Sequence, residues 1–335
     1  MTNISQSHHK TDEFLANTCL FISIEYKLHS LSLELGMSKQ QILHLIESRM
    51  HNDGMIETGI SGIQIFRMTE PVRCAPAVYD PCVIAIVSGT KEALLDGQRY
   101  KYDSQKYLCC PMSMPVEAGT PKASPDNPLL GVYISLDTRA ITELAIEMDI
   151  DAGIARQPRV GRRPQALSLA RWSDDFTDAL LRLLQVSENA TDAAVLGRGR
   201  LKELHYAILK GEAGLAARRA FGTSNDIART IDLLSSRLDE TISIDEMAAQ
   251  VGMSRAVFHR RFKEATTMSP IQFVKSMRLN KAAMKIASGL TVTQAAMDVG
   301  YVSTSQFSRE FKRMYGKSPR QWFDAQQFLA ERARL

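Results

Sequence analysis

A stretch near the end of the chain contains the same pattern twice. Residues 243–263 read SIDEMAAQVGMSRAVFHRRFK, and residues 291–312 read TVTQAAMDVGYVSTSQFSREFK. Gly252 corresponds to Gly300 at an offset of 48 residues, and a one-residue insertion in the turn makes the offset 49 from there on. Two copies are too few for a stacked repeat array. The repetition therefore indicates a pair of related structural units.

Each copy predicts two short helices joined by a glycine-containing turn, which is the helix-turn-helix pattern. A Ser or Thr opens the first helix and a Glu or Gln follows three residues later, as in a capping box. A glycine ends that helix, where a left-handed residue is favoured, and a serine caps the second helix. These positions are Ser243, Glu246, Gly252 and Ser254 in the first copy, and Thr291, Gln294, Gly300 and Ser303 in the second. The two units are predicted over residues 243–266 and 291–315.

The second helix of each unit has an inner and an outer face. Two phenylalanines lie four residues apart in each helix, so each pair should pack on one face towards a core. The opposite face carries small, hydrogen-bonding and cationic residues, as a helix in the DNA major groove requires. A solvated helix face is the alternative, but the shared register of the two copies favours DNA binding. The outer stripes are Ala256, His259, Arg260 and Lys263 in one copy, and Ser305, Ser308, Arg309 and Lys312 in the other.

With these motifs, residues from about 222 to 335 resemble the DNA-binding domain of the AraC/XylS family of bacterial transcription regulators. The resemblance includes the linking segment SPIQFVKSMRLNKA from Ser269 and the closing segments AAMDVGYVS from Ala295 and GKSPRQW from Gly316. It implies that one linking helix holds the two units so that both recognition helices enter successive major grooves of promoter DNA. Pro270 suits the first turn of that helix.

Residue roles follow from the stripes. We expect base contacts from Ala256, through a thymine methyl group, and from His259 and Arg260 in one groove. Ser305, Gln306 and Arg309 should serve the next groove, although Gln306 could instead belong to the Ser303 capping box. Phosphate contacts carry no direct sequence information and add salt-dependent affinity. The residues expected to make them are Arg255, Arg261, Lys263, Lys312 and Arg313.

Charge is distributed unevenly along the 335 residues, which suffice for two domains. From residue 222 to the end there are 17 Lys and Arg against 11 Asp and Glu, whereas the preceding part is slightly acidic. A basic module joined to a near-neutral one is typical of a nucleic-acid-binding protein with a second function. We expect domains over residues 1–220 and 222–335, with Gly211–Thr223 as the linker.

The front half predicts helix, then strands, then helix. Residues 1–50 have a helical pattern, and strand-like runs with turns every eight to twelve positions suggest a small β-sandwich or barrel. Two amphipathic helices are expected over Gln165–Val186 and Thr191–Lys210, after a Gly/Pro/Arg-rich loop at Arg156–Pro164. The leucines 180, 181, 183 and 184 fit a dimer stripe or internal packing, with a slight preference for the dimer. The strand runs are Gly62–Met68, Cys82–Gly89, Lys91–Leu95 with an Asp96-Gly97 turn, Tyr100–Tyr102, Lys106–Cys110, Met114–Ala118 and Leu129–Leu136.

Residues from about 55 to 155 resemble, more loosely, the cupin-like N-terminal domain of one branch of the same family. The resemblance rests on YDPCVIAIVSGTK from Tyr79 and GVYISLD from Gly131. It implies a barrel that senses a small-molecule effector, followed by helices that carry dimer contacts. The expected fold is α+β: an N-terminal cupin-like small β-barrel with flanking helices, and a C-terminal all-α double helix-turn-helix domain.

Enzymatic and metal chemistry are not indicated. Metal-dependent cupins rely on clustered His, and no His occurs between His51 and His205. We find no G-x-S-x-G, phosphate loop or paired-carboxylate motif, so neither an enzyme nor a cofactor is expected. The adjacent Cys109 and Cys110 allow a redox or electrophile sensor, with inert burial as the alternative, since neighbouring strand residues face opposite sides.

The cellular location is predicted from the N-terminal segment, the length of the apolar runs and the cysteines. The segment before Asp12 does not read as a signal peptide, and no run approaches the roughly 18 apolar residues of a membrane span. The five cysteines are odd in number and lack C-x-x-C spacing, which favours a reduced, cytoplasmic protein. A sequence-specific, effector-controlled regulator is the expected function, with promoter DNA, a small-molecule effector, RNA polymerase and a second copy as candidate partners. An architectural nucleic-acid-binding protein with little sequence preference is the alternative.

Overall fold

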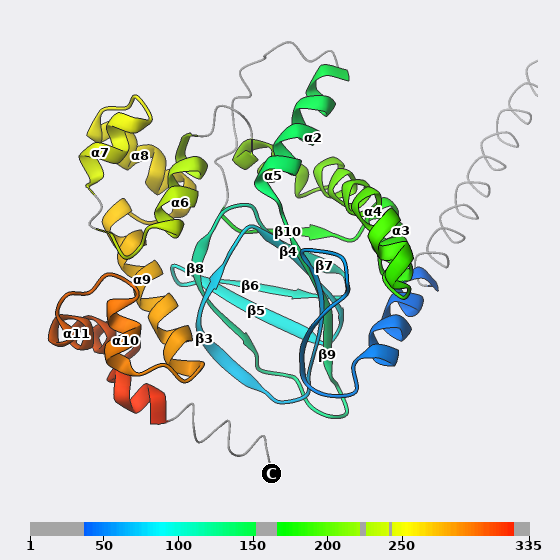
Figure 1. The fold of residues 1–335 in the computed structure, drawn as a ribbon, viewed down its shortest axis with the longest axis horizontal. Helices are drawn as coiled ribbons and strands as arrows, with labels where there is room; N and C mark the ends of the chain where they lie inside the picture. Colours follow the sequence, from blue (N-terminus) through cyan, green and yellow to red (C-terminus); the bar gives the residue numbers. More distant parts are fainter. Residues whose placement is uncertain (1–36, 152–165, 222–225, 241–242, 325–335) are drawn as a thin grey trace, which may run out of the picture.

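The computed structural model describes residues 37–151, 166–221, 226–240 and 243–324. The fold is α+β: a curled antiparallel sheet with flanking helices comes first, and a helical region follows (Figure 1). The helix expected within residues 1–36, the Arg156–Pro164 loop and Cys19 lie outside the described residues. Within them, residues 37–49 are helical, with Ile42 and Ile46 fully buried, as the sequence pattern predicts.

The sheet has ten strands in the order β1-β2-β9-β4-β7-β6-β5-β8-β3, and β10 pairs with β7 outside this path. All seven predicted strand runs are confirmed. Asp96 and Gly97 have positive φ values of 50° and 77°, as a tight hairpin turn requires. The strands are β1 (Gly54–Glu57), β2 (Ile63–Met68), β3 (Val72–Tyr79), β4 (Cys82–Ser88), β5 (Thr90–Leu95), β6 (Gln98–Asp103), β7 (Lys106–Cys110), β8 (Met114–Thr120), β9 (Leu129–Ser135) and β10 (Ser168–Arg171).

Three strands were not predicted from the sequence. β1 is exposed along its length, so it lacks the alternation that identifies a strand. β3 contains Pro76, which is compatible only with an edge strand or a bulge, and β3 does lie at the end of the sheet. β10 lies where a helix was expected from Gln165. That prediction was wrong because residues 168–171 pair with β7, and the helix begins only after the Ser173 cap.

Helices of the front half cover one side of the sheet: α2 (Thr138–Asp151), α3 (Asp174–Val186), α4 (Ala190–Lys210) and α5 (Gly214–Phe221). The expected linker at Gly211–Thr223 was also wrong in part, since α5 packs against α2 and α4. The four α3 leucines, at positions 180, 181, 183 and 184, are all buried. They therefore pack internally and do not form the dimer stripe that the sequence slightly favoured.

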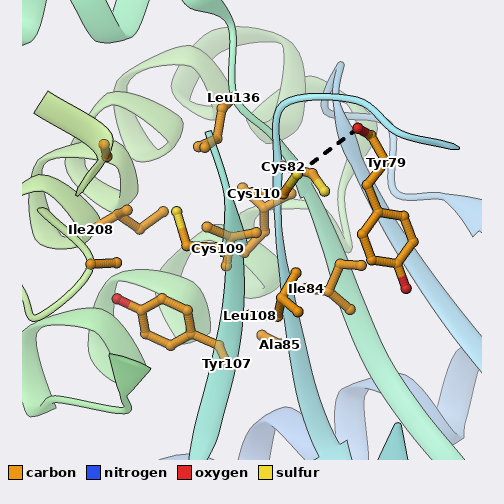
Figure 2. Close-up of a cluster of buried hydrophobic side chains, with 14 of the residues drawn as sticks. Tyr79, Cys82, Ile84, Ala85, Tyr107, Leu108, Cys109, Cys110, Leu136 and Ile208 are labelled. Atoms are coloured by element: carbon orange, nitrogen blue, oxygen red, sulfur yellow. Dashed lines mark hydrogen bonds between the residues drawn. The ribbon is translucent and has the colours of Figure 1, made fainter. Parts of the chain in front are cut away.

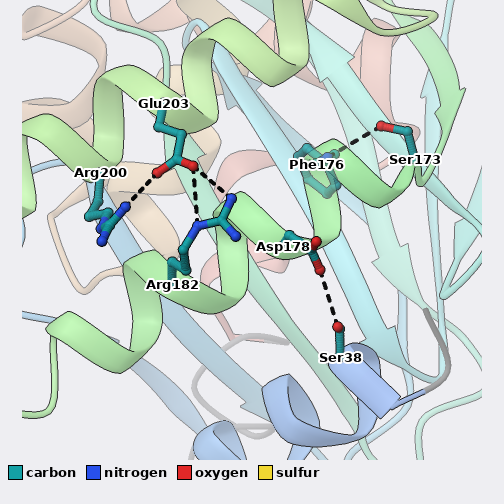
Figure 3. Close-up of polar contacts among 7 residues, drawn as sticks. All are labelled: Ser38, Ser173, Phe176, Asp178, Arg182, Arg200 and Glu203. Atoms are coloured by element: carbon teal, nitrogen blue, oxygen red, sulfur yellow. Dashed lines mark hydrogen bonds and ion pairs between the residues drawn. The ribbon is translucent and has the colours of Figure 1, made fainter. Parts of the chain in front are cut away.

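Polar contacts fix these helices to one another (Figure 3). Glu203 on α4 accepts from Arg182 on α3 at 2.6 Å and from Arg200 at 3.0 Å. Ser38 in the first helical segment donates to Asp178 on α3 at 3.2 Å. The buried apolar side chains of these helices and of the sheet belong to one cluster, so the helices and the sheet form one packed unit.

The C-terminal region contains α6 (Asp226–Ser236), α7 (Ile244–Gln250), α8 (Arg255–Thr266), α9 (Pro270–Ala287), α10 (Val292–Met297) and α11 (Thr304–Tyr315). α9 lies between the α7–α8 pair and the α10–α11 pair, and it also packs on β3 and β8 (Figure 1). The buried apolar side chains of the first pair belong to the same cluster as the sheet. Those of the second pair form a separate cluster.

Candidate nucleic-acid interface

The first helix-turn-helix unit has the predicted caps and turn, but only the Ser243 half of its predicted capping box is formed. Ser243 Oγ accepts from the backbone N–H of Glu246 at 3.3 Å, and Gly252 adopts a left-handed φ of 63°. Ser254 Oγ then accepts from the N–H of Val257 at 3.4 Å. Because each cap satisfies a backbone donor that the helix leaves free, helix starts and turn are fixed by local sequence.

The second unit repeats this geometry, and its capping box is likewise only half formed. Thr291 caps α10 by accepting from the N–H of Gln294 at 3.2 Å, but the Gln294 side chain donates to Asp298 at 2.8 Å. The contact from the side chain back to the cap, which would complete the predicted box, is therefore replaced. Gly300 has φ 84°, and a Cβ there would lie 2.7 Å from the Leu238 carbonyl oxygen. Glycine is required at this turn by conformation and by space.

Phenylalanine packing sets the inner face of each recognition helix. The rings of Phe258 and Phe262 are 5.5 Å apart between centroids, and those of Phe307 and Phe311 are 5.4 Å apart. All four side chains are fully buried. Phe262 also meets Phe273 of α9 edge-on at 5.3 Å. This packing fixes the rotation of α8 and α11, so the opposite face points outward.

Most of the predicted DNA-contacting residues lie on that outward face. Ala256, Arg260, Ser305, Gln306 and Arg309 are exposed, as are the five residues expected at phosphates. His259 differs because it is half-buried, and its Nε2 is enclosed without a hydrogen-bond partner. The structure thus gives no support to His259 as a base-contacting residue.

Two of the exposed side chains also have protein partners. Arg255 forms an ion pair with Asp245 on α7 at 3.1 Å, so part of its charge is neutralised within the first unit. The backbone N–H of Gln306 donates to the capping Ser303, while its side-chain amide lies 3.5 Å from Glu310. The Gln306 side chain is therefore not used in the Ser303 capping box.

Glu310 joins α11 to its neighbours. It accepts from the Tyr301 hydroxyl at 2.8 Å and pairs with Lys275 of α9 at 3.2 Å. Burial alone would raise the pKa of Glu310, but the hydrogen bonds from Tyr301, Lys275 and Gln306 outweigh it and hold that pKa below its usual range. No local sequence pattern predicts this cluster, because Lys275 lies 35 positions away from Glu310.

The linking helix α9 begins as predicted. Ser269 and Gln272 form a complete capping box, with Pro270 at the first turn. Arg278 donates to the carbonyl oxygens of Leu238 and Glu240 at 2.8 and 2.7 Å, and Lys281 donates to that of Ser235 at 2.8 Å. These bonds hold the end of α6 and the segment after it against the middle of α9.

The cysteines of the sheet are packed rather than accessible. Figure 2 shows Cys109 directed towards Ile208 of α4, while Cys110 lies beside Cys82. Both Cys109 and Cys110 are fully buried, and burial raises the pKa of Cys109 to about 12 and that of Cys110 well above its usual value. Because the thiolate is the reactive form, the structure favours inert packing over the sensor hypothesis.

A buried histidine lies near these cysteines, and no pattern in the sequence predicts its burial. His205 on α4 is only 2% exposed, and its Nε2 lies 3.3 Å from the Ser135 carbonyl oxygen at the end of β9. Burial lowers the pKa of His205. It therefore joins α4 to the sheet as a neutral side chain near pH 7.

A pocket of about 200 Å³ lies where the sheet meets α2, α5 and α6. Arg229 of α6, which pairs with Asp226, and Asp232 supply its charged groups. Ser113, in the loop between β7 and β8, also lines the pocket and donates to Asp80 at 3.0 Å. The remaining lining residues are Pro81, Pro111, Met112, Thr138, Thr142, Ala220 and Ala228. Side chains from both halves of the chain therefore form one mostly apolar cavity.

Two kinds of feature are absent from the described ranges. No cluster of three or more His, Cys, Asp or Glu suited to a metal ion is present among those residues. None of the helices described there is both long and apolar enough to span a membrane.

Comparisons with known proteins agree with the geometry. Residues 59–216 match the family model of the AraC-type transcriptional regulator N-terminus, and residues 247–325 match a helix-turn-helix domain model. The regulatory protein SoxS of Salmonella typhimurium is 30% identical over 94 residues, which is 28% of this chain and 88% of SoxS. The transcriptional regulator MtrA of Neisseria gonorrhoeae is 35% identical over 97 residues, 29% of this chain but only 32% of MtrA.

A solved structure resembles the fold over most of the chain. ToxT from Vibrio cholerae superposes with a TM-score of 0.52 at 14% identity, covering 78% of this chain and 97% of ToxT. Such low identity supports the fold alone. Together, the paired helix-turn-helix units, the curled sheet before them and the matches to both halves show that this chain belongs to the AraC/XylS family of transcriptional regulators.

Proposed function

We propose that this protein is a sequence-specific regulator that reads two successive major grooves with α8 and α11. The observation that carries this proposal is the matched exposure of the two recognition helices. A small residue followed four positions later by an arginine lies outward on each, as Ala256 and Arg260 and as Ser305 and Arg309. An arginine in this position can donate two hydrogen bonds to guanine.

We assign Ala256, Arg260, Ser305, Gln306 and Arg309 to base edges, and Arg255, Arg261, Lys263, Lys312 and Arg313 to phosphates. His259, first expected at a base edge, is given a packing role instead because its Nε2 is enclosed. The proposed domain division is residues 1–220 and 222–335. It is supported by the gap between the two family matches and by the end of α5 at Phe221.

A small-molecule effector is proposed to act through the junction pocket. The cavity touches the sheet and α6 together, so an occupant would sense how the two halves meet. Its mostly apolar walls favour a small apolar molecule, and a carboxylate on that molecule would compete with Asp226 for the Arg229 guanidinium. ToxT, whose fold is similar, has been solved with an unsaturated fatty acid bound. The pocket should be tested by thermal shift of the full chain with short carboxylic acids, repeated with Arg229→Gln.

We further propose a homodimer through the exposed face of α4. Val195, Gly199, Lys202 and Tyr206 follow the helical period along this face, and Val195 and Tyr206 are 73% and 45% exposed. In an antiparallel pair of α4 helices, Val195 would oppose Tyr206 and Gly199 would oppose Lys202. Large residues would then meet small ones in a self-complementary contact of two-fold symmetry. Bound at a promoter, such a dimer would act on RNA polymerase.

The deciding experiment is selection of random duplex DNA by the full-length protein at near-physiological salt. We expect a two-part motif with centres about 34 Å, one helical turn, apart. An unstructured pool, with binding that weakens evenly as salt rises, would instead identify an architectural nucleic-acid-binding protein and overturn the proposal.

A further inference from the structure

A buried asparagine joins the sheet to the linking helix of the DNA-binding region. Asn280 lies in the middle of α9 and is 3% exposed. Its side-chain amide donates to the carbonyl oxygens of Ala77 on β3 and Val116 on β8, at 2.8 and 2.9 Å. Ala77 and Val116 are register partners in the β3–β8 pairing. One side chain therefore reaches two adjacent strands more than 160 positions away in the sequence.

The strand edge at this contact is protected by the same helix. β3 lies at the end of the sheet, and the backbone N–H of Val78 donates to Met284 Sδ of α9 at 3.3 Å. An uncovered strand edge invites pairing with other chains. α9 thus covers this edge, with Asn280 as its polar anchor.

Asn280 is also bonded to the second recognition helix. Tyr315, the last residue of α11, donates its hydroxyl to Asn280 Oδ1 at 2.6 Å. Burial, followed by the nearby Glu117 carboxylate of β8, raises the pKa of Tyr315, so the hydroxyl remains a donor. A continuous path of hydrogen bonds therefore runs from the β3–β8 rung through Asn280 to the end of α11.

This path matters because the two helix-turn-helix units differ in how their apolar side chains pack. Phe258 and Phe262 of the first unit belong to the apolar cluster that includes the sheet. Phe307 and Phe311 of the second unit belong to a separate one. The first unit is thus tied to the front half by buried apolar packing, whereas the second has a core of its own and a specific polar connection.

We propose that Asn280 is a positioning residue for DNA recognition. By bonding to both the sheet and α11, it fixes the orientation of α11 relative to α8. The front half would thereby set the spacing of half-sites that the protein accepts. This inference rests on the proposed two-groove function. A buried asparagine could instead serve only to specify the fold, and such a role would not alter the preference for spacing.

The test measures full-length binding to operators whose two half-sites are at the selected spacing or are moved by one base pair in either direction. The variants are Asn280→Ala, which removes the whole bridge, and Tyr315→Phe, which removes the hydroxyl and keeps the ring. Tyr315 packs against Phe311 at 4.6 Å and Trp322 at 5.6 Å, so its ring should continue to hold α11. Lys281→Ala is the matched control because its bond to Ser235 stays within the C-terminal region.

Wild-type protein and Lys281→Ala should prefer the selected spacing by about tenfold, the discrimination of one good base contact. Asn280→Ala and Tyr315→Phe should bind all three spacings with affinities within about threefold of one another. An unchanged spacing profile in Tyr315→Phe, with its melting temperature preserved, would overturn the inference while leaving the proposed function intact. A wild-type protein without any two-part motif would show that the proposed function itself has failed.

Discussion

In the proposed interface, Arg260 is the residue of the first unit expected to contribute most to base discrimination. It is exposed on the outer face of α8, opposite the buried Phe258 and Phe262. A guanidinium reaching a guanine edge contributes discrimination as well as affinity.

Arg260→Ala should therefore weaken binding to the selected site by about 1–3 kcal/mol and relax base preference at one position. Arg313→Ala, the control at a proposed phosphate contact, should weaken binding to all sequences alike and reduce the salt slope by about one. Both are measured by fluorescence anisotropy on cognate and scrambled duplexes. An equal loss on both duplexes for Arg260→Ala would remove it from the base-reading set.

Glu310 should make the stability of the C-terminal region depend on acid pH. Its pKa is lowered in the folded state, so the unfolded chain binds more protons between that pKa and about 4.3. The stabilisation is then fully present above about pH 4.3 and is lost as pH falls through the folded pKa. Urea unfolding of wild-type protein and Glu310→Gln should differ at pH 7 and converge in acid. A difference that stays constant with pH would contradict this assignment.

At the scale of the element, the two glycine turns provide a matched comparison. Gly252 and Gly300 both have left-handed φ values, 63° and 84°. A Cβ at Gly252 meets nothing within 4 Å, whereas at Gly300 it would meet the backbone of Leu238 and Asp239 below 3 Å. The second turn is thus packed against the segment that follows α6.

Gly252→Ala should cost about 1–2 kcal/mol from backbone strain alone. Gly300→Ala should cost more, because the backbone must also move, and such packing conflicts typically add about 1–3 kcal/mol. Urea denaturation of the full chain measures both. Equal costs would mean that the segment after α6 moves aside freely.

At the scale of the whole molecule, the face of α4 decides the proposed assembly. Val195 is the most exposed apolar side chain on this helix, and Lys202, two turns further along the same face, forms an ion pair with Glu147 of α2 at 3.0 Å. Val195→Glu would place a carboxylate at the proposed contact without disturbing a buried residue.

Val195→Glu should therefore be a monomer in sedimentation velocity. The melting temperature of that monomer should be unaffected in a separate thermal-unfolding measurement. Met55→Glu, at a 52% exposed apolar residue on β1, is the control that should leave assembly unchanged. A dimer that survives Val195→Glu would place the interface elsewhere.

Local sequence determined the helix-turn-helix units almost completely. Caps at Ser243 and Thr291, glycines with left-handed φ values and phenylalanine pairs at four-residue spacing act within a few positions, so they can be recognised in one dimension. The seven strand-like runs and the Asp96-Gly97 turn were predictable for the same reason.

What only the tertiary structure decided depends on partners far away in the chain. Residues 168–171 form a strand because they pair with β7, the α3 leucines are buried within the core, and the Nε2 of the half-buried His259 is enclosed, which its outer-stripe spacing did not reveal. Asn280 appears in the sequence as one polar residue of an amphipathic helix. Its role arises only when two carbonyl oxygens and a tyrosine hydroxyl come within hydrogen-bonding distance, because the energy of a buried amide depends on which partners surround it.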